Sequence, residues 1–262
     1  MDEKMEKHYD LVIKSSMINW WSVIKHLDIP MPKTNIVGLT NNDRRSLYGL
    51  IENEKLPDAL KKELLDAAND IGYPLFMRSD QGSGKHQWND TCFVKDETNL
   101  INQLGKLIDW HGSLFPPMPF GAIVFRSYIE MDSKFCAFEG LPIARERRYF
   151  IKDGKIDDHT PYWPEDAIRF YNSTKEYEDA PWKEMLSELN KEAPEEIDLL
   201  SGYALEVAKH FKEYWSVDFC KAKNGDWYLL DMARGEVSWN PKNDEKEKEK
   251  TSKFLEEINI WN

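Results

Sequence analysis

The sequence predicts an α+β fold that combines antiparallel hairpins with amphipathic helices. Two hairpins are indicated by the turn pairs Asp153-Gly154 and Asn224-Gly225, each flanked by segments rich in apolar and aromatic residues. A helix is indicated from Pro194, because proline and two acids open it and apolar residues then recur at helical spacing as far as Phe211. With 262 residues and 41% hydrophobic residues, the chain can bury a core as one large domain or two small ones.

The first part of the chain alternates between helices and strands. Apolar spacing predicts one helix over residues 11–24, which stops before two prolines, and a short strand over 35–39. A second helix is predicted over 57–71 and ends at a glycine. Residues 73–78 then form an expected strand, followed by a polar, glycine-bearing turn.

The middle and end of the chain continue this pattern. A strand is expected at 92–94, an amphipathic helix at 97–110 and a strand at 122–125. The two hairpins have arms at 147–151 with 155–156 and at 215–220 with 227–230. The tail from 242 is nearly all charged before its last apolar residues, so it is either a solvated helix with one docking face or a partly disordered extension.

Charge and composition argue against several partners and locations. The formal net charge of -12 opposes non-specific binding to nucleic acid or to an anionic membrane. The three cysteines are far apart and form no CxxC pair, so neither a disulfide framework nor a zinc cluster is indicated. The first residues are charged and no apolar run follows them, which predicts a cytoplasmic protein.

Asp218 and Asp231 lie on or beside the two arms of the second hairpin. Adjacent arms can bring two carboxylates to one spot, and hard oxygen ligands suit a Mg²⁺ ion that bridges nucleotide phosphates. The alternative is that both are ordinary edge or turn residues.

A glycine-bearing loop between residues 77 and 86 carries two cations. Arg78 ends a strand and Lys85 follows across the loop, an arrangement that suits a triphosphate. The loop is not a Walker loop, because its first glycine is missing and His86 stands where Ser or Thr would bind magnesium. A solvated turn with two incidental cations is the alternative.

Three arginines lie close together at positions 145, 147 and 148. Strand alternation places Glu146 and Arg148 on one face and Arg145 and Arg147 on the other, so Glu146 and Arg148 can reach a common cleft. The cluster favours recognition of a polyanion or a carboxylate over plain surface charge. The histidines have no metal-site spacing; His86 and His159 lie near charged loops, but ordinary polar loop roles are favoured for both.

From about residue 73 to 239, the order of motifs resembles the ATP-grasp superfamily. The segment YPLFMRSD resembles the strand with the first phosphate-contacting cation, and VFRSYI resembles the adenine-contacting hinge. The segment RERRYFIKDG resembles the nucleotide-pocket hairpin, and VDFCKAKNGDWYLLD the metal-binding hairpin. Arginine at position 78, where most members have lysine, resembles a divergent clade met in phage and bacterial genomes. The RERRYF segment is also similar to ATP-grasp proteins that assist assembly of a translation initiation factor.

The resemblance implies an ATP-grasp fold, with two α+β subdomains gripping ATP between antiparallel sheets, and Mg²⁺ as a second cofactor. It divides the chain into a short N-terminal region (1–70), the ATP-grasp domain (71–240) and a charged helical tail (241–262). The implied site residues are Arg78 and Lys85 on phosphates, Ser127, Tyr128 and Ile129 beside adenine, Glu146 near the ribose, Arg148 at the γ-phosphate or an acyl phosphate, and Asp218 and Asp231 on magnesium.

One departure concerns the second metal. The family usually ends its metal hairpin with an acid, any residue and asparagine, whereas Asp231 and Met232 are followed here by Ala233. Glu236 or Asn240 could supply the missing oxygen from a shifted position.

The activity implied by the resemblance is a carboxylate-amine or carboxylate-thiol ligase that acts through an acyl phosphate. Two alternatives stay open: an ATP-dependent assembly factor that grips a partner without turnover, and an ATP-grasp kinase. The short N-terminal region carries no substrate motif, so the carboxylate-bearing substrate is open, and a peptide or protein acceptor is one expectation.

Overall fold

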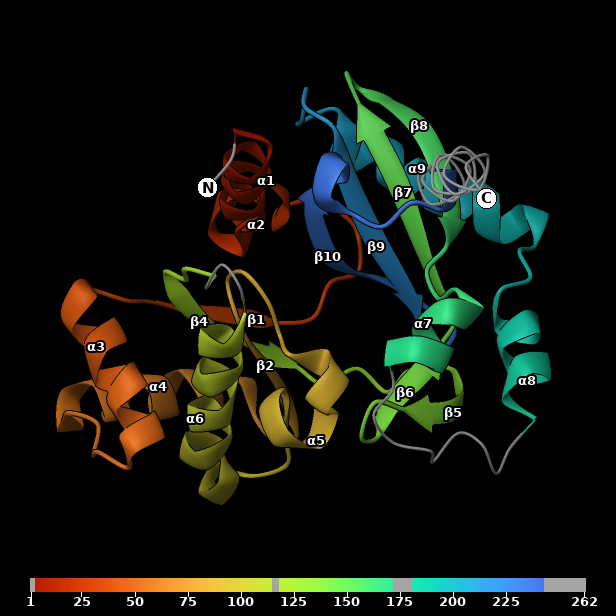
Figure 1. The fold of residues 1–262 in the computed structure, drawn as a ribbon. Coiled ribbons are helices and arrows are strands. Elements are labelled where there is room, and N and C mark those ends of the chain that lie inside the picture. Colours follow the sequence, from red (N-terminus) through yellow and green to blue (C-terminus); the bar gives the residue numbers. More distant parts are fainter. Residues whose placement is uncertain (1–2, 115–117, 172–180, 243–262) are drawn as a thin grey trace, which may run out of the picture.

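Two antiparallel sheets face each other across the molecule in the computed structural model, which describes residues 3–114, 118–171 and 181–242 (Figure 1). The N-terminal sheet has the strand order β1-β4-β2-β3, and the C-terminal sheet has the order β10-β9-β7-β8. A small sheet of β5 and β6 lies at one end of the C-terminal sheet. The mixture of helices with antiparallel sheets confirms the predicted α+β class.

The N-terminal sheet is covered by helices that pack its apolar side. Its strands are β1 (Thr34–Gly38), β2 (Leu75–Ser79), β3 (Phe93–Val94) and β4 (Ala122–Ser127). The helices around it are α3 (Asn41–Gly49), the 3-10 turn η1 (Leu50–Glu52), α4 (Asp58–Ile71) and α6 (Glu97–Ser113). Leu64 of α4 and Leu104 of α6 are fully buried in the core under this sheet. The predicted strands and helices of this region are confirmed, while α3 was not predicted.

The C-terminal sheet packs against α9 (Pro194–Ala208). Its strands are β7 (Glu146–Lys152), β8 (Lys155–Pro161), β9 (Trp215–Lys221) and β10 (Trp227–Arg234), followed by the 3-10 turn η3 (Gly235–Val237). Leu200 and Val207 of α9 join Val217 in one buried core. Both predicted hairpins and the predicted helix are confirmed, and the turn residues Asp153 and Gly154 adopt the positive φ angles of 49° and 75°.

A third core lies under the small sheet of β5 (Ser133–Ala137) and β6 (Leu141–Ala144). The nearby helical segments are η2 (Lys85–Gln87), α5 (Trp88–Thr91), α7 (Glu165–Tyr171) and α8 (Trp182–Leu189). Trp88, Phe138 and Trp163 fill this core. The sequence did not predict this small sheet.

The single helix predicted over residues 11–24 is wrong, because the chain forms α1 (Glu3–Lys14) and α2 (Met17–Ile24) instead. Ser16 separates them: its side chain accepts a hydrogen bond from the N–H of Ile18 and so caps α2. The Ser16 hydroxyl also donates to the carboxylate of buried Asp80, at 2.5 Å. The break therefore depends on a contact with a residue 64 positions away.

A β-bulge interrupts the pairing of β9 with β10. Leu229 pairs with Phe219, but the next pair is Asp231 with Asp218, so Leu230 is the extra residue. The bulge places the two aspartates directly opposite each other.

Other predictions lie partly outside these elements. The charged tail, apart from residues 241 and 242, lies outside the described residues, and the division into three regions stays a prediction. Within the described ranges, the structure has no helix that is long and apolar enough to cross a membrane.

Candidate functional site

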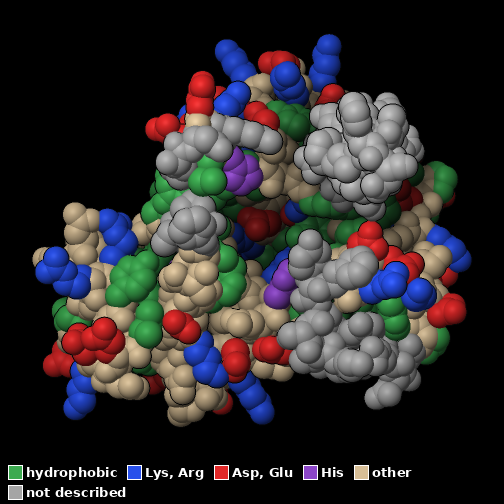
Figure 2. Space-filling view, viewed as in Figure 1, with side chains coloured by type: hydrophobic (Ala, Val, Ile, Leu, Met, Phe, Trp, Pro, Cys, Tyr) green, Lys and Arg blue, Asp and Glu red, His purple; other side chains and the backbone are tan. Residues whose placement is uncertain are grey.

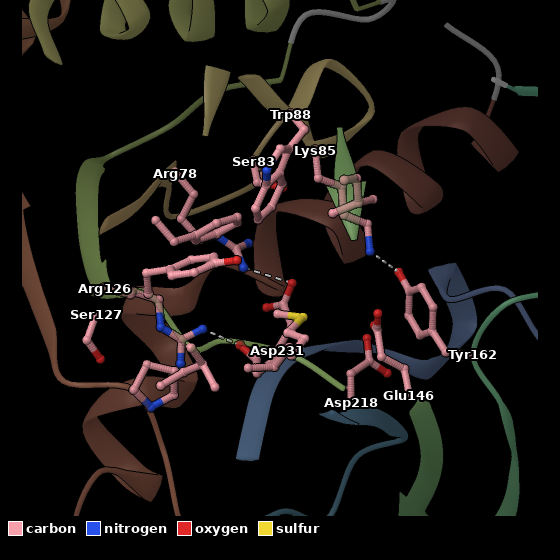
Figure 3. Close-up of a pocket in the computed structure, with 18 of the residues that line it drawn as sticks. Arg78, Ser83, Lys85, Trp88, Arg126, Ser127, Glu146, Tyr162, Asp218 and Asp231 are labelled. Carbon is pink, nitrogen blue, oxygen red and sulfur yellow. Dashed lines mark hydrogen bonds and ion pairs between the residues drawn. The ribbon is translucent and has the colours of Figure 1, made fainter. Parts of the chain in front are cut away.

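A pocket lies between the two sheets, and Figure 2 shows the molecule hollowed near the centre of this face. Of the residues that the sequence singled out, those that line the pocket are Arg78, Lys85, Ser127, Tyr128, Ile129, Glu146, Asp218 and Asp231. They come from both sheets and from the loop between β2 and β3 (Figure 3). Arg148 reaches the pocket wall through Asp218. The fold therefore gathers all the predicted site residues in one place.

Arg78 connects the N-terminal sheet to the C-terminal sheet. Its side chain leaves β2 and is buried, and its Nη1 atom lies 2.8 Å from Oδ2 of Asp231 on β10. Its Nε atom donates to the carbonyl of Ser79 at 2.9 Å. The first predicted phosphate cation is thus paired with one predicted metal ligand.

Lys85 lies where the glycine-bearing loop enters η2. The preceding Gly84 has φ +62°, and a Cβ atom there would lie 3.2 Å from Thr91 and Trp110, so glycine suits this turn. The amine of Lys85 donates to the hydroxyl of Tyr162 at 2.8 Å and lies 4.7 Å from the ring centre of Trp163. The loop therefore aims its cation into the pocket.

Burial by itself would lower the pKa of Lys85, but the neighbouring Tyr162, Glu146 and Asp218 outweigh it, and the pKa lies above its ordinary value. The amine stays charged at neutral pH. A buried ammonium group in contact with aromatic rings is suited to binding an anionic ligand.

Glu146 and Arg148 lie on the pocket face of β7, as the alternation predicted. The carboxylate of Glu146 accepts from the indole N–H of Trp163 at 2.8 Å. Burial raises the pKa of Glu146, while Lys85 and Trp163 act in the opposite direction. This carboxyl group is the pocket acid that protonates most readily among the shifted groups.

Arg148 forms a two-pronged ion pair with Asp218. Its Nε and Nη2 atoms donate to the two carboxylate oxygens, both at 2.8 Å, and its Nη1 atom donates to the carbonyl of Trp239 at 3.1 Å. Burial acts to lower the pKa of Arg148, but Asp218 outweighs it and the pKa is raised. The guanidinium is therefore a permanent positive charge at the wall of the pocket.

Arg145 and Arg147 lie on the other face of β7, where they hold α9. Arg147 is fully buried; its Nε lies 2.5 Å from Glu196, and its Nη atoms donate to the carbonyls of Leu189 and Lys191. Arg145 donates to the same Lys191 carbonyl at 2.9 Å. The expectation that the whole cluster recognises an anion is wrong for Arg147, because groups of the chain already surround its charge.

Asp218 and Asp231 fit the chemistry of a nucleotide-bound magnesium ion. Mg²⁺ takes oxygen ligands and is usually held by one or two carboxylates together with substrate phosphates. The two aspartates pair across the hairpin and both line the pocket. Each is also ion-paired, Asp218 with Arg148 and Asp231 with Arg78. No group of three metal-binding side chains occurs in the described part of the chain, so phosphates would have to complete the coordination.

The expected adenine hinge follows the end of β4. The N–H of Ser127 already donates to the carbonyl of Lys33 at 2.9 Å. Tyr128 packs its ring against Phe93, with 5.0 Å between the ring centres. Backbone groups of Tyr128 and Ile129 therefore lie beyond the strand pairing, at the pocket.

The sequence reasoning missed Arg126 as a site residue, although it is part of the quoted hinge motif. It is buried and lines the pocket. Tyr162 and Trp163, suggested as pocket-lining residues, do line it. Glu236 pairs with Arg234 at 3.0 Å, and Asn240 accepts from the N–H of Lys242 at 2.9 Å; neither is among the pocket-lining residues.

His86 and His159 make ordinary side-chain contacts. His86 stacks on Phe138 with 4.2 Å between ring centres, and burial together with Lys85 lowers its pKa to about 4. His159 lies 3.2 Å from Glu192 and stacks on Tyr149. Both contacts agree with the non-catalytic roles favoured from the sequence.

Comparison with known proteins gives a family match and a fold. A family model described as ATP-grasp domain, R(2)K clade family 3, matches residues 67–251. Cdc123 from Schizosaccharomyces pombe is similar in structure at 13% identity, with a TM-score of 0.50, over 86% of this chain and 85% of that chain. A comparison with curated proteins found no match.

Two enzymes are similar over most of this chain but are themselves longer. D-alanine--D-alanine ligase from Bacillus anthracis, in a complex with ATP, is 17% identical with a TM-score of 0.49, over 91% of this chain and 62% of that chain. N5-carboxyaminoimidazole ribonucleotide synthetase from Thermotoga maritima is 12% identical with a TM-score of 0.43, over 86% of this chain and 43% of that chain. This chain therefore spans less than two thirds of either enzyme.

Proposed function

The chain belongs to the ATP-grasp domain family whose model matches it over residues 67–251, and on this basis we propose that it binds Mg-ATP in the pocket between its two sheets. The observation that carries the proposal is the gathering of buried cations and paired carboxylates in that pocket. Arg78 and Lys85 are aimed into it from one lobe, and Asp218 and Asp231 from the other. Cations placed opposite metal-binding acids are what a polyphosphate with its magnesium ion requires.

Each part of the nucleotide has a proposed contact. Ser127, Tyr128 and Ile129 offer backbone groups to adenine, and Glu146 lies near the ribose. The phosphates replace Asp231 and Tyr162 as partners of Arg78 and Lys85. Asp218 and Asp231 hold the magnesium ion, which supplies charge neutralisation on the phosphates.

We further propose that the bound ATP activates a carboxylate. A carboxylate oxygen of the substrate attacks the γ-phosphorus, the bond to the β-phosphate oxygen breaks, and ADP leaves. The nitrogen of an amine, or a thiol sulfur, then attacks the acyl carbon, loses its proton and expels inorganic phosphate. Arg148 and Lys85 offset the charge on the transferring phosphoryl group, and positioning replaces any nucleophilic side chain.

Calorimetric titration tests the nucleotide site. ATP is titrated into the wild type with and without Mg²⁺, and into Asp231→Asn and Lys85→Ala. We expect magnesium-dependent binding that both substitutions weaken, by roughly 10-fold for the lost charge of Lys85. Lys183→Ala, which removes the exposed partner of Glu165 on α7 and α8, serves as the matched control and should bind as the wild type does. Absence of ATP binding under every condition would overturn the proposal.

A second candidate function is an ATP-dependent binding factor that closes on a protein partner without turnover. It is favoured by Ala233, which stands where the family has its second-metal asparagine, and by the other contacts of Glu236 and Asn240. A protein with one metal site and no second oxygen ligand would bind the nucleotide but transfer phosphate slowly.

Products separate the candidates. A ligase releases ADP and phosphate together with a joined product, whereas a kinase releases ADP and leaves a phosphorylated substrate. A binding factor gives neither at an appreciable rate. A screen of carboxylate-bearing peptides and small acids, with ADP and phosphate measured separately, distinguishes all three.

A further inference from the structure

Arg126 has a buried donor group that no described residue binds. The side chain leaves β4, the strand next to β2, and is almost fully buried. Its Nε atom donates to the hydroxyl of Thr34 at 3.2 Å, and its Nη1 atom donates to the carbonyl of Leu230. Among the described residues, the Nη2 atom finds no hydrogen-bond partner, although it is shielded from solvent. Figure 3 shows this guanidinium at the pocket, beside Ser127 and Asp231.

The two partners of Arg126 are neutral, so its charge is not balanced by a bonded carboxylate. The nearby acid, Asp231, is already paired with Arg78 at 2.8 Å. The ring of Trp21 lies 5.8 Å from the guanidinium carbon, which gives at most a weak cation–π contact. Burial, together with the positive charge of Arg78, lowers the pKa of Arg126, and Asp231 only partly opposes this.

A buried charge without a counterion is costly, because the lost hydration is not returned by the protein. A solvent water could satisfy the free N–H but would leave the charge unbalanced. An anion in the pocket would do both. Phosphate is the best match, since the planar guanidinium bonds phosphate oxygens in two-pronged geometry.

We propose that Arg126 is a third phosphate-binding cation of the pocket, which completes its hydrogen bonds and its charge balance on a phosphate group of the bound nucleotide. This inference rests on the proposed binding of ATP. Arg126 lies next in sequence to the adenine hinge and shares the pocket with Arg78, so it lies where the phosphate chain must leave the adenosine. Unlike Arg78 and Lys85, it has a donor that need not give up a protein partner to bind.

The experiment compares adenosine, AMP, ADP and ATP as calorimetric ligands for the wild type, Arg126→Gln and Arg126→Lys. Arg234→Gln is the matched control, because Arg234 pairs with Glu236 and the Tyr214 carbonyl and is not among the pocket-lining residues. We expect Arg126→Gln to weaken ATP binding by roughly 10- to 100-fold, the range for a lost hydrogen bond to a charged group. Adenosine affinity should change by less than about 2-fold, which is below the worth of one such bond.

Arg126→Lys covers the case in which the glutamine variant does not fold. Lysine keeps the charge but has one nitrogen, so it cannot both bond the Leu230 carbonyl and reach a phosphate as arginine can. It should lose ATP affinity while keeping adenosine affinity.

Equal losses for adenosine and ATP would mean that Arg126 only holds the two sheets together, which overturns the inference. Unchanged ATP affinity in a folded Arg126→Gln would also overturn it while leaving the proposed ATP site intact. A wild type that binds no ATP would overturn both proposals.

Discussion

Arg147 and Arg148 are neighbours in the chain, yet they lie in two different polar clusters on opposite faces of β7. Arg147 is fully buried between the sheet and α9, with Glu196 and two backbone carbonyls as partners. Arg148 lies on the pocket face and pairs with Asp218. Both are buried arginines with acidic partners, so burial and ion pairing alone do not separate a structural arginine from a functional one.

The difference lies in what remains available to a ligand. The cluster of Arg147 is sealed by α9, which supplies its acidic partner Glu196. The cluster of Arg148 opens on a pocket that also holds Lys85 and Glu146. A structural cluster is one that the chain completes by itself, whereas the pocket cluster has donors and charges that a ligand can take over.

Removal of Arg147 should have the largest effect on stability. Arg147→Met leaves Glu196 buried without its main partner, so we expect the free energy of unfolding to fall by about 3–5 kcal/mol. Urea denaturation followed by tryptophan fluorescence measures this. Arg145→Met is the matched control, because Arg145 lies farther from Glu196, at 3.8 Å, and it should cost less. A similar loss in both variants would contradict the distinction.

Removal of Arg148 should affect ligand binding more than folding. In Arg148→Met the exposed side of the pocket can hydrate Asp218, so the unfolding free energy should fall by less than in Arg147→Met. If Arg148 faces the γ-phosphate, ATP affinity should fall by roughly 10- to 100-fold and ADP affinity by much less. Calorimetry with both nucleotides measures the ratio. Arg147→Met, where it folds, should keep the ratio of the wild type; an equal loss for ATP and ADP in Arg148→Met would place Arg148 elsewhere.

His111 offers a pH test of a buried group that should carry no charge. It is fully buried beside the rings of Trp110 and Phe120, and burial, then the charge of Arg78, lowers its pKa from 6.5 to about 4. The unfolded chain binds the proton more tightly, so stability is retained above pH 6.5 and lost as the pH falls towards 4. At about pH 5 the loss should be about 2 kcal/mol. His111→Phe should flatten the curve of unfolding free energy against pH over this window, and an unchanged slope would contradict the assignment.

Local signals carried most of the fold prediction. The Asp153-Gly154 turn, the Pro194 helix start and the alternation of β7 are short-range patterns, and the structure confirms all three. The break at Ser16 was missed because it depends on Asp80, which is distant in sequence.

The site was predictable where charged residues occurred in a recognisable motif. Arg78 and Lys85 were found in this way, and they share the pocket. Arg126 was missed, because a single arginine inside an apolar strand gives no local signal; its importance comes from the absence of a described partner for Nη2 and from its neighbour Arg78. Arg147 was misjudged because its acidic partners, Glu192 and Glu196, come from a segment far along the chain, at and just before α9.

The extra residue in β10 also decides which side of the sheet a carboxylate occupies. With strict alternation Leu230 would face Asp218, and Asp231 would sit opposite Val217 and turn to the apolar side under α9. One inserted residue therefore moves a negative charge from the hydrophobic interior to the pocket. In any relative whose hairpin lacks this insertion, an aspartate aligned with Asp231 by sequence would not occupy the same place in space.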